Sequence, residues 1–258
     1  MGSTGKRAMK RQLRRQSIWL GESLRWIIGE KVLAGENRPR ALDVGSGPGF
    51  VADSLGDLLD VTCLDIDPDM LKACQARGFR SLRGSALDLP FGDGAFDVVY
   101  STFLLLWLED PDSAVREMSR VSRSHVLCLA EPDYGARIDW PQGLEPVRGL
   151  IIDGVRAQGG DPYIGRKLRD LFRRNGLSVR IGVHSGVWSI DRLRQEQRDE
   201  WEFVRSLATD LPEDELDLID SRWRRALRDG SLLQFNPIFY ALGVKRTHQN
   251  EEYLSRHM

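Results

Sequence analysis

The feature that most constrains this chain's fold is a short apolar run leading directly into three closely spaced glycines. Arg40 to Val44 predicts a buried strand, and Gly45, Gly47 and Gly49 follow it before a helical pattern begins. Glycines at a strand-to-helix turn let backbone N–H groups approach a ligand closely. The segment therefore predicts a ligand-binding turn of an α/β protein.

The spacing of these glycines excludes two common ligand classes. A dinucleotide site with the pattern GxGxxG would need glycine at position 50, where this chain has Phe50. A phosphate-binding P-loop would need Gly-Lys-Ser/Thr, which is absent. A glycine-rich turn that binds no ligand is the structural alternative.

Beyond this turn, apolar runs alternate with helical patterns. Strands are expected at 40–44, 61–65, 79–83, 96–101, 125–130, 177–184 and 232–244. Helices are expected near 49–59, 67–78, 110–121, 144–158, 166–175, 191–208 and 213–228. In the last strand, Asn236-Pro237 indicates a bulge or an edge position. This order predicts a Rossmann-like, doubly wound α/β fold with a seven-stranded, mostly parallel sheet.

Helical segments outside the alternation predict an arm and a cap. We expect an N-terminal helical arm at 1–39, a main domain at 40–246 with cap insertions at about 132–164 and 189–230, and a polar tail at 247–258. The arm carries Leu13, Leu20, Leu24, Ile27 and Ile28 at helical spacing.

Charge is distributed unevenly along the chain. The net charge is −1, but Met1 to Arg40 holds ten Lys/Arg and three Glu, a net of +7, which leaves −8 for the remainder. The arm has three interpretations: a solvated helix packed on the body, a lid in which Gln16, Trp19 or Arg25 closes over the ligand, or a binding surface for RNA or an acidic partner.

The cysteines and the hydropathy of the chain indicate the cellular compartment that we expect for it. Cys63, Cys74 and Cys128 form no CxxC pair, which favours buried free thiols in a reducing cytoplasm and no metal site. No apolar stretch is long enough for a membrane-spanning helix, and the basic N-terminus lacks the pattern of a signal peptide.

From about Arg40 to Leu129 the chain resembles the class I S-adenosylmethionine-dependent methyltransferases, especially the small-molecule, quinone-biosynthesis-like subgroup. Three segments carry the resemblance: Asp43-Val-Gly45-Ser-Gly47-Pro-Gly49, Gly84-Ser-Ala-Leu-Asp88-Leu-Pro-Phe91, and Phe96 through Pro111. The resemblance implies S-adenosylmethionine as the cofactor and S-adenosylhomocysteine as the product.

The resemblance also implies a set of cofactor contacts. Asp65, at the end of the second strand, would accept hydrogen bonds from both ribose hydroxyls. Ser85 stands where the family commonly has Asp, and Leu106 where relatives often have His. The full set expected to hold the cofactor is Asp43, Gly45, Ser46, Gly47, Gly49, Asp65, Ile66, Met70, Ser85, Ala86, Leu87, Ser101 and Thr102, with Trp19 and Arg25 from the arm.

Polar residues after the fifth strand are candidates for the acceptor side, because ligands of open α/β sheets bind beyond the carboxyl ends of the strands. Glu131 and Asp133 could orient or deprotonate an acceptor, and Tyr134 and Arg137 could hold it. In the structural alternative, Glu131 caps a buried loop and Asp133 pairs with Arg137.

The resemblance implies in-line transfer of a sulfonium methyl group to a small-molecule acceptor. Two alternatives stay open: methylation of RNA or protein guided by the basic arm, and a cofactor-binding module without turnover. The sequence does not indicate whether O, N, C or S is methylated, nor the oligomeric state.

Overall fold

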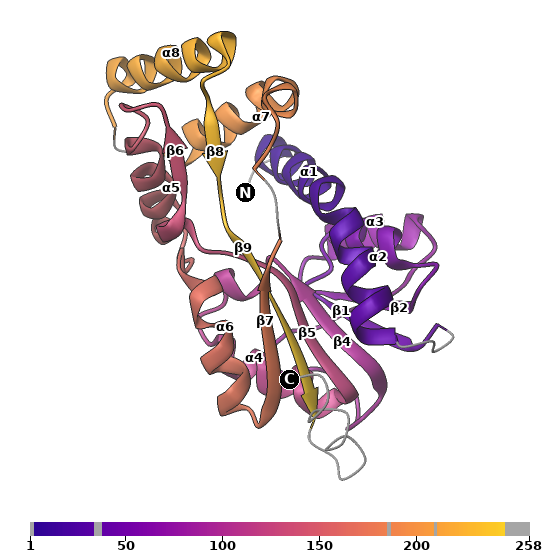
Figure 1. The fold of residues 1–258 in the computed structure, drawn as a ribbon. Helices are drawn as coiled ribbons and strands as arrows, with labels where there is room; N and C mark the ends of the chain where they lie inside the picture. The colour runs from indigo at the N-terminus through magenta and orange to yellow at the C-terminus, as the bar shows by residue number, and fades with distance from the viewer. Residues whose placement is uncertain (1–2, 34–37, 185–186, 209–210, 246–258) are drawn as a thin grey trace.

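The computed structural model describes residues 3–33, 38–184, 187–208 and 211–245. Its main sheet has seven strands in the order β3-β2-β1-β4-β5-β9-β7 (Figure 1). The strands are β1 (Arg40–Val44), β2 (Asp60–Asp65), β3 (Arg80–Arg83), β4 (Phe96–Thr102), β5 (Ser122–Pro132), β7 (Leu177–Val183) and β9 (Ile238–Lys245). Only β9 runs antiparallel to its neighbours, so the expected mostly parallel, seven-stranded sheet is confirmed.

Side chains of β1 alternate between two cores. Leu42 and Val44 join a core that includes α4 (Pro111–Val121) and α6 (Ile164–Arg174), whereas Ala41 joins a core with α1 and α2 (Phe50–Leu55). Helix α3 (Pro68–Ala76) begins after Asp67, whose carboxylate accepts a hydrogen bond from the Asp69 N–H as an N-cap. The sheet is thus covered on both faces, as a doubly wound fold requires.

The arm forms α1 (Ser3–Ile28), which continues as one π-helical turn (Gly29–Leu33) and packs against α2. Leu24, Ile27 and Ile28 are fully buried, which is why this basic helix lies on the body. His184, which follows β7, accepts or donates a hydrogen bond at each ring nitrogen, to Ser23 Oγ at 2.7 Å and to Leu129 O at 2.6 Å. These contacts give His184 a structural role.

A cap extends from one end of the sheet (Figure 1). It consists of α5 (Pro146–Ala157), α7 (Ile190–Leu207), α8 (Glu213–Asp229) and a two-stranded ribbon of β6 (Ile138–Trp140) and β8 (Leu233–Phe235). The expectation of one long strand at 232–244 was wrong: the chain divides at Asn236-Pro237 into β8 of the cap and β9 of the main sheet. Proline has no N–H to continue a ladder, so it separates the two pairings.

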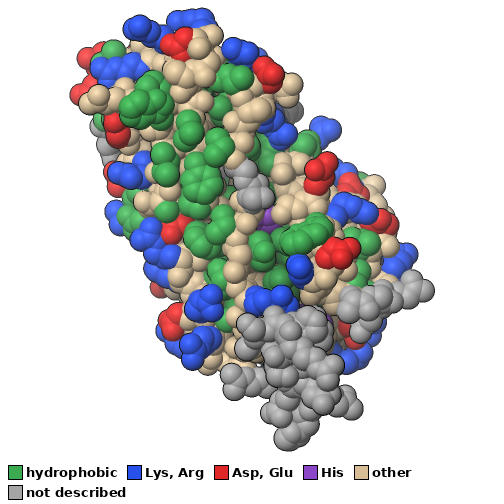
Figure 2. All heavy atoms as spheres, in the orientation of Figure 1, with side chains coloured by type: hydrophobic (Ala, Val, Ile, Leu, Met, Phe, Trp, Pro, Cys, Tyr) green, Lys and Arg blue, Asp and Glu red, His purple; other side chains and the backbone are tan. Residues whose placement is uncertain are grey.

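The β6·β8 ribbon has its polar side chains inside and its apolar ones outside. Asp139 and Gln234 face each other across the ribbon and are buried, whereas Ile138, Trp140 and Leu233 are exposed. Figure 2 shows hydrophobic side chains over this part of the cap. The inner polar face therefore belongs to a buried network, which is described below.

Three further expectations concern the cysteines, membrane-spanning helices and the C-terminal tail. All three cysteines are free and buried. Among the described residues, no helix is long and apolar enough to cross a membrane. The expected polar tail at 247–258 lies outside the described residues.

Candidate cofactor site and acceptor side

The glycine loop lies at the carboxyl end of β1, between β2 and β4. The N–H groups of Gly45 and Ser46 donate to Leu64 O at 2.8 and 3.0 Å. Gly47 and Gly49 have φ angles of +53° and +80°, which residues with a Cβ rarely adopt. The loop is therefore a fixed turn whose shape depends on glycine, as the sequence pattern predicts.

Asp65 supports this loop from the end of β2. Its Oδ2 accepts a hydrogen bond from Gly47 N at 2.8 Å, and its Oδ1 accepts one from Asp67 N at 2.8 Å. A carboxylate has further lone pairs on each oxygen, so these bonds leave acceptor capacity for a ligand hydroxyl. Its position fits the ribose contact expected from the sequence.

A buried carboxylate without a hydrogen-bond partner on one oxygen lies beneath the loop. Asp43 is 2% exposed, and its Oδ2 accepts no hydrogen bond of ordinary geometry from the described residues. Burial raises the pKa of Asp43 well above its ordinary value, although the buried Tyr100 phenol of the neighbouring strand acts to lower it. Thr102 Oγ1 and Gln16 Oε1 are also buried without partners, and all three residues line one cavity. These atoms match the ammonium group at the methionine end of S-adenosylmethionine.

The opposite end of the candidate site is apolar and exposed. Ile66 is 65% exposed and Leu87 is 41% exposed, although both are large aliphatic side chains. Gly84 N donates to Asp65 O, so the segment carrying Ser85 and Ala86 lies beside Ile66. Exposed aliphatic side chains next to backbone N–H groups suit a planar base, which fits the adenine of the cofactor. The Ser85 Oγ accepts a hydrogen bond from Leu87 N, and Met70 is buried on α3.

Helix α1 covers the methionine end of this site. Leu13, Gln16, Ser17, Leu20 and Leu24 line the cavity, which measures about 40 Å³. A water needs about 10–15 Å³ by this measure, so this enclosed part of the site has room for a small polar group or a few waters. Helix α1 therefore forms the cover of this part of the site.

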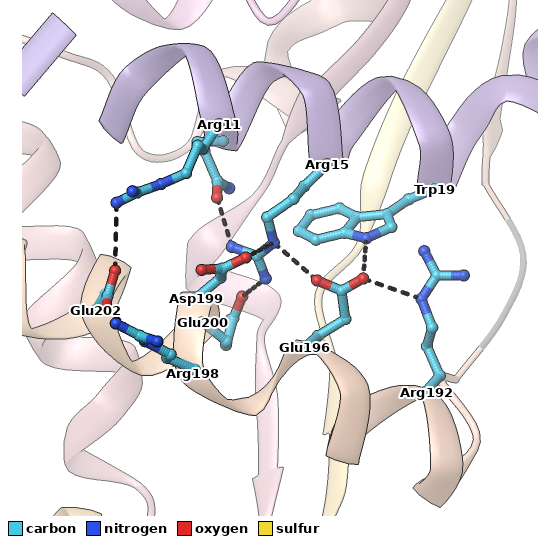
Figure 3. A network of polar contacts seen from close by, with 10 residues as sticks. Arg11, Arg15, Trp19, Arg192, Glu196, Arg198, Asp199, Glu200 and Glu202 are labelled. Atoms are coloured by element: carbon cyan, nitrogen blue, oxygen red, sulfur yellow. Dashed lines mark hydrogen bonds and ion pairs between the residues drawn. The ribbon is translucent and has the colours of Figure 1, made fainter. Parts of the chain in front are cut away.

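Of the arm residues expected over the cofactor, only Gln16 lines the cavity. Arg25 lies elsewhere, with two guanidinium nitrogens on Asp57 at 2.6 and 2.7 Å. Trp19 faces α7 instead, where its Nε1 donates to Glu196 at 3.2 Å (Figure 3). Its ring also meets that of Trp188, just before α7, edge-on. In this closed arrangement Trp19 and Arg25 hold the arm in place and do not contact the cofactor cavity.

Glu131 has the position of a loop cap. Its side chain is fully buried and accepts hydrogen bonds from Leu104 N, Leu105 N and Leu106 N at 2.9, 2.7 and 3.3 Å. Burial raises its pKa to about 8, against the lowering effect of the three N–H donors. The carboxyl group thus fixes the segment after β4, as the structural alternative expected.

We expect Glu131→Gln to change how stability depends on pH. The folded-state pKa of Glu131 lies above its ordinary value, so its contribution is present at low pH and is lost as pH rises from about 4.5 to about 8. Urea unfolding of both proteins between pH 5 and pH 8.5 measures this. The difference in unfolding free energy should shift in favour of the variant as pH rises. A difference that does not vary with pH would contradict the assignment.

The other acceptor candidates are also engaged within the protein. Asp133 pairs with Arg166 through two contacts of 2.5 and 2.7 Å, not with Arg137 as the structural alternative expected. Arg137 pairs instead with Asp139 at 2.8 and 3.0 Å. Tyr134 is buried, and neither it nor the two carboxylates of Glu131 and Asp133 line the cofactor cavity. A catalytic role for these residues stays a prediction.

Sequence reasoning missed the residues that join the arm to the cap. Arg15 is buried and its Nε donates to Glu196 Oε2 at 2.8 Å, although 181 residues separate them (Figure 3). Glu200 is buried beside it. No sequence signal pointed to Arg15, because it follows Leu13 by two residues and therefore does not share a helix face with Leu13 and Leu20.

Comparisons with known proteins agree on one class. Residues 42–130 match the family model described as a methyltransferase domain. A demethylmenaquinone methyltransferase of Thermus thermophilus is 35% identical over 150 residues, which cover 51% of this chain and 68% of that protein. The ajmaline N-methyltransferase of Rauvolfia serpentina is 38% identical over 100 residues, which are 34% of each chain. The chain spans between about a third and a half of the length of several curated relatives that it matches.

A solved structure shares the fold over most of the chain. The YcgJ protein of Bacillus subtilis superposes with a TM-score of 0.57 at 20% identity, covering 88% of this chain and 99% of that one. The similarity of fold thus extends past the segment that matches the family model.

Proposed function

The chain belongs to the class I S-adenosylmethionine-dependent methyltransferases, and we propose that it transfers the sulfonium methyl group of this cofactor to a small-molecule acceptor. The observation that carries the proposal is the pair of acids at the glycine loop. Asp43 has an unpartnered, buried oxygen at the cavity, and Asp65 retains acceptor capacity at the end of the neighbouring strand. A ligand that carries an ammonium group at one end and a ribose in the middle satisfies both.

The residues of the chain supply binding and orientation. Asp43, Thr102 and Gln16 would hold the methionine end, Asp65 the ribose, and the 84–87 segment with Ile66 the base. When bound, the cofactor supplies a methyl group already activated on sulfur. Fixing that methyl group in line with a nucleophile, in a space closed to water by α1, accounts for most of the acceleration such a site needs.

The acceptor side is proposed at the carboxyl ends of β4 and β5, facing the cap. Tyr134 and Arg137 follow β5 directly, and Glu131 fixes the segment after β4. We propose that Tyr134 orients the acceptor, while Glu131 and Asp133 act on it only if their present contacts open. The names of two relatives are a demethylmenaquinone methyltransferase and an ajmaline N-methyltransferase, so both a quinone and a nitrogen acceptor stay within the proposal.

The pairing of the arm's arginines with carboxylates of the protein favours a small acceptor over RNA. Arg15 forms ion pairs with carboxylates of α7, and Arg11 lies 3.4 Å from Glu202, so both charges are already paired within the protein. On the face shown in Figure 2, Lys and Arg side chains are interspersed with Asp and Glu, unlike the continuous basic surface of a nucleic-acid binder. We propose a cytoplasmic location from the three free thiols.

Calorimetry with S-adenosylhomocysteine tests the proposed cofactor. We expect saturable binding to the full chain, and a free energy of unfolding that rises with the logarithm of the ligand concentration once that concentration exceeds Kd. Guanosine diphosphate, which carries a ribose but a different base and a diphosphate in place of the amino acid, is the control and should not bind. Absence of binding by S-adenosylhomocysteine would remove the function. Incubation with methyl-labelled cofactor and a panel of quinols, amines and phenols then identifies the acceptor class.

A further inference from the structure

A single buried carboxylate joins three elements that the proposed reaction needs together. Glu200 of α7 is 6% exposed. Its Oε2 lies 3.5 Å from Arg15 Nη2 of α1, and its Oε1 lies 3.5 Å from Arg137 Nη1 and 2.6 Å from Gln234 Nε2 of β8. The carboxylate therefore lies between the arm, the segment after β5 and the inner face of the cap ribbon.

The arm side of this junction holds the cofactor cavity closed. Arg15 is 8% exposed and also contacts Glu196 and Asp199, at 2.8 and 3.7 Å, and Gln12 at 2.7 Å (Figure 3). Its guanidinium lies 4.6 Å from the Trp19 ring, which in turn meets Trp188. Arg15 is on the same helix as Leu13 and Gln16, which line the cavity, so freeing Arg15 would loosen the cover.

The other side of the junction holds the acceptor segment. Arg137 is 4% exposed and binds Asp139 with two nitrogens, which fixes the chain just after the turn that contains Tyr134. Within the described residues, Arg137 has no hydrogen bond or ion pair to α1. Glu200 is thus the carboxylate that the two arginines share. Either guanidinium, left without it, would be a buried cation with weaker pairing.

We propose that Glu200 is a positioning residue that couples closure of α1 over the cofactor to the placement of the Tyr134–Arg137 segment. When α1 closes, Arg15 joins Glu200 and completes the charge balance that holds Arg137 in place. When α1 opens to exchange the cofactor, Glu200 loses one cation and the acceptor segment loosens with it. The role of this coupling in methyl transfer rests on the proposed function. The coupling between α1 and the Tyr134–Arg137 segment can be measured in the protein without cofactor.

The first experiment measures the release of S-adenosylhomocysteine by stopped flow. We expect Glu200→Gln to raise the dissociation rate constant by about tenfold or more, because the neutral amide holds neither arginine firmly. Glu202→Gln is the matched control on the same helix, since Glu202 meets Arg11 and Arg198 near the surface, and should change the rate less than about twofold. Equal rates for Glu200→Gln and the wild type would overturn the proposal.

The second experiment measures coupling at a distance by amide hydrogen exchange without cofactor. Arg15→Lys should speed exchange in residues 134–140, and Arg137→Lys should speed exchange in residues 13–24, which a purely local role would not produce. If either variant leaves the other segment at wild-type rates, the proposal is wrong. Both lysine variants retain the positive charge beside Glu200, so we expect them to fold. They therefore test the coupling even if Glu200→Gln does not fold. Should S-adenosylhomocysteine not bind at all, the proposed function fails, whereas this second result still decides the coupling.

Discussion

Asp43→Asn is expected to weaken binding of S-adenosylhomocysteine by about 100-fold or more while leaving the cofactor-free protein at least as stable. A charged hydrogen-bonded pair contributes about 1.5–3 kcal/mol, and burial at 2% exposure increases the cost of removing one partner. In the cofactor-free protein, however, Asp43 Oδ2 has no hydrogen-bond partner of ordinary geometry among the residues that the structure describes, so the neutral amide relieves an unfavourable burial. Calorimetry and thermal unfolding measure the two effects separately.

Dependence on pH gives this prediction a second signature. Because burial raises the pKa of Asp43, its charged form is disfavoured until a cation pairs with it, and wild-type affinity should rise with pH through that pKa. In Asp43→Asn this rise should disappear. Methylthioadenosine, which lacks the amino acid, should bind both proteins alike. Asp97→Asn, at the far end of β4, controls for loss of an acid from the sheet. A less stable Asp43→Asn protein with wild-type affinity would show that Asp43 has a structural role.

Asp65→Ala is expected to reduce the affinity for both S-adenosylhomocysteine and methylthioadenosine by at least about 100-fold. Two charge-assisted hydrogen bonds to ribose hydroxyls would contribute about 1.5–3 kcal/mol each. The same change frees Gly47 N, so the glycine loop also loses its support. The two acids therefore have different signatures: loss of Asp43 spares the ligand without an amino acid, and loss of Asp65 affects both ligands.

Asp60→Ala is the matched control for Asp65→Ala. Asp60 begins the strand that Asp65 ends, and its carboxylate pairs with Arg80 on the surface. We expect wild-type affinity for both ligands. If Asp65→Ala bound methylthioadenosine as tightly as Asp60→Ala does, the ribose assignment would be wrong.

The sequence was most informative where local rules determine structure. The apolar run of β1 ends at Gly45 because the loop needs positive φ angles, and Asp67 begins α3 because its carboxylate accepts a backbone N–H. The positions of Asp43 and Asp65 beside the loop follow from neighbouring parallel strands that end at one edge of the sheet. These features depend on few residues that are close in the chain.

Features that depend on distant pairs could not be predicted. Strand β8 separates from β9 because it pairs with β6, and Ile138–Trp140 is too short for its alternation to indicate a strand. The choice between a catalytic and a capping Glu131 required the position of Leu104 to Leu106. Likewise, the partner of Arg15 is known only once α7 is placed against α1, because nothing in a run of surface-like charges specifies which are buried.

The division of the last apolar segment at Asn236-Pro237 determines which part of the molecule can move to admit and release ligands. Two residues separate the cap ribbon from β9, and on the other side of the ribbon a short stretch joins β5 to β6. Two such short tethers leave little slack for a hinge, so the cap should move with the sheet as one body. Helix α1, in contrast, is joined to the cap by side-chain contacts, such as that of Arg15 with Glu196, which can separate without a change in the sheet. Ligands should therefore enter and leave the site beside α1. Among proteins with this fold, differences in acceptor size should arise from the side chains that line the cap, because the backbone of the cap stays fixed.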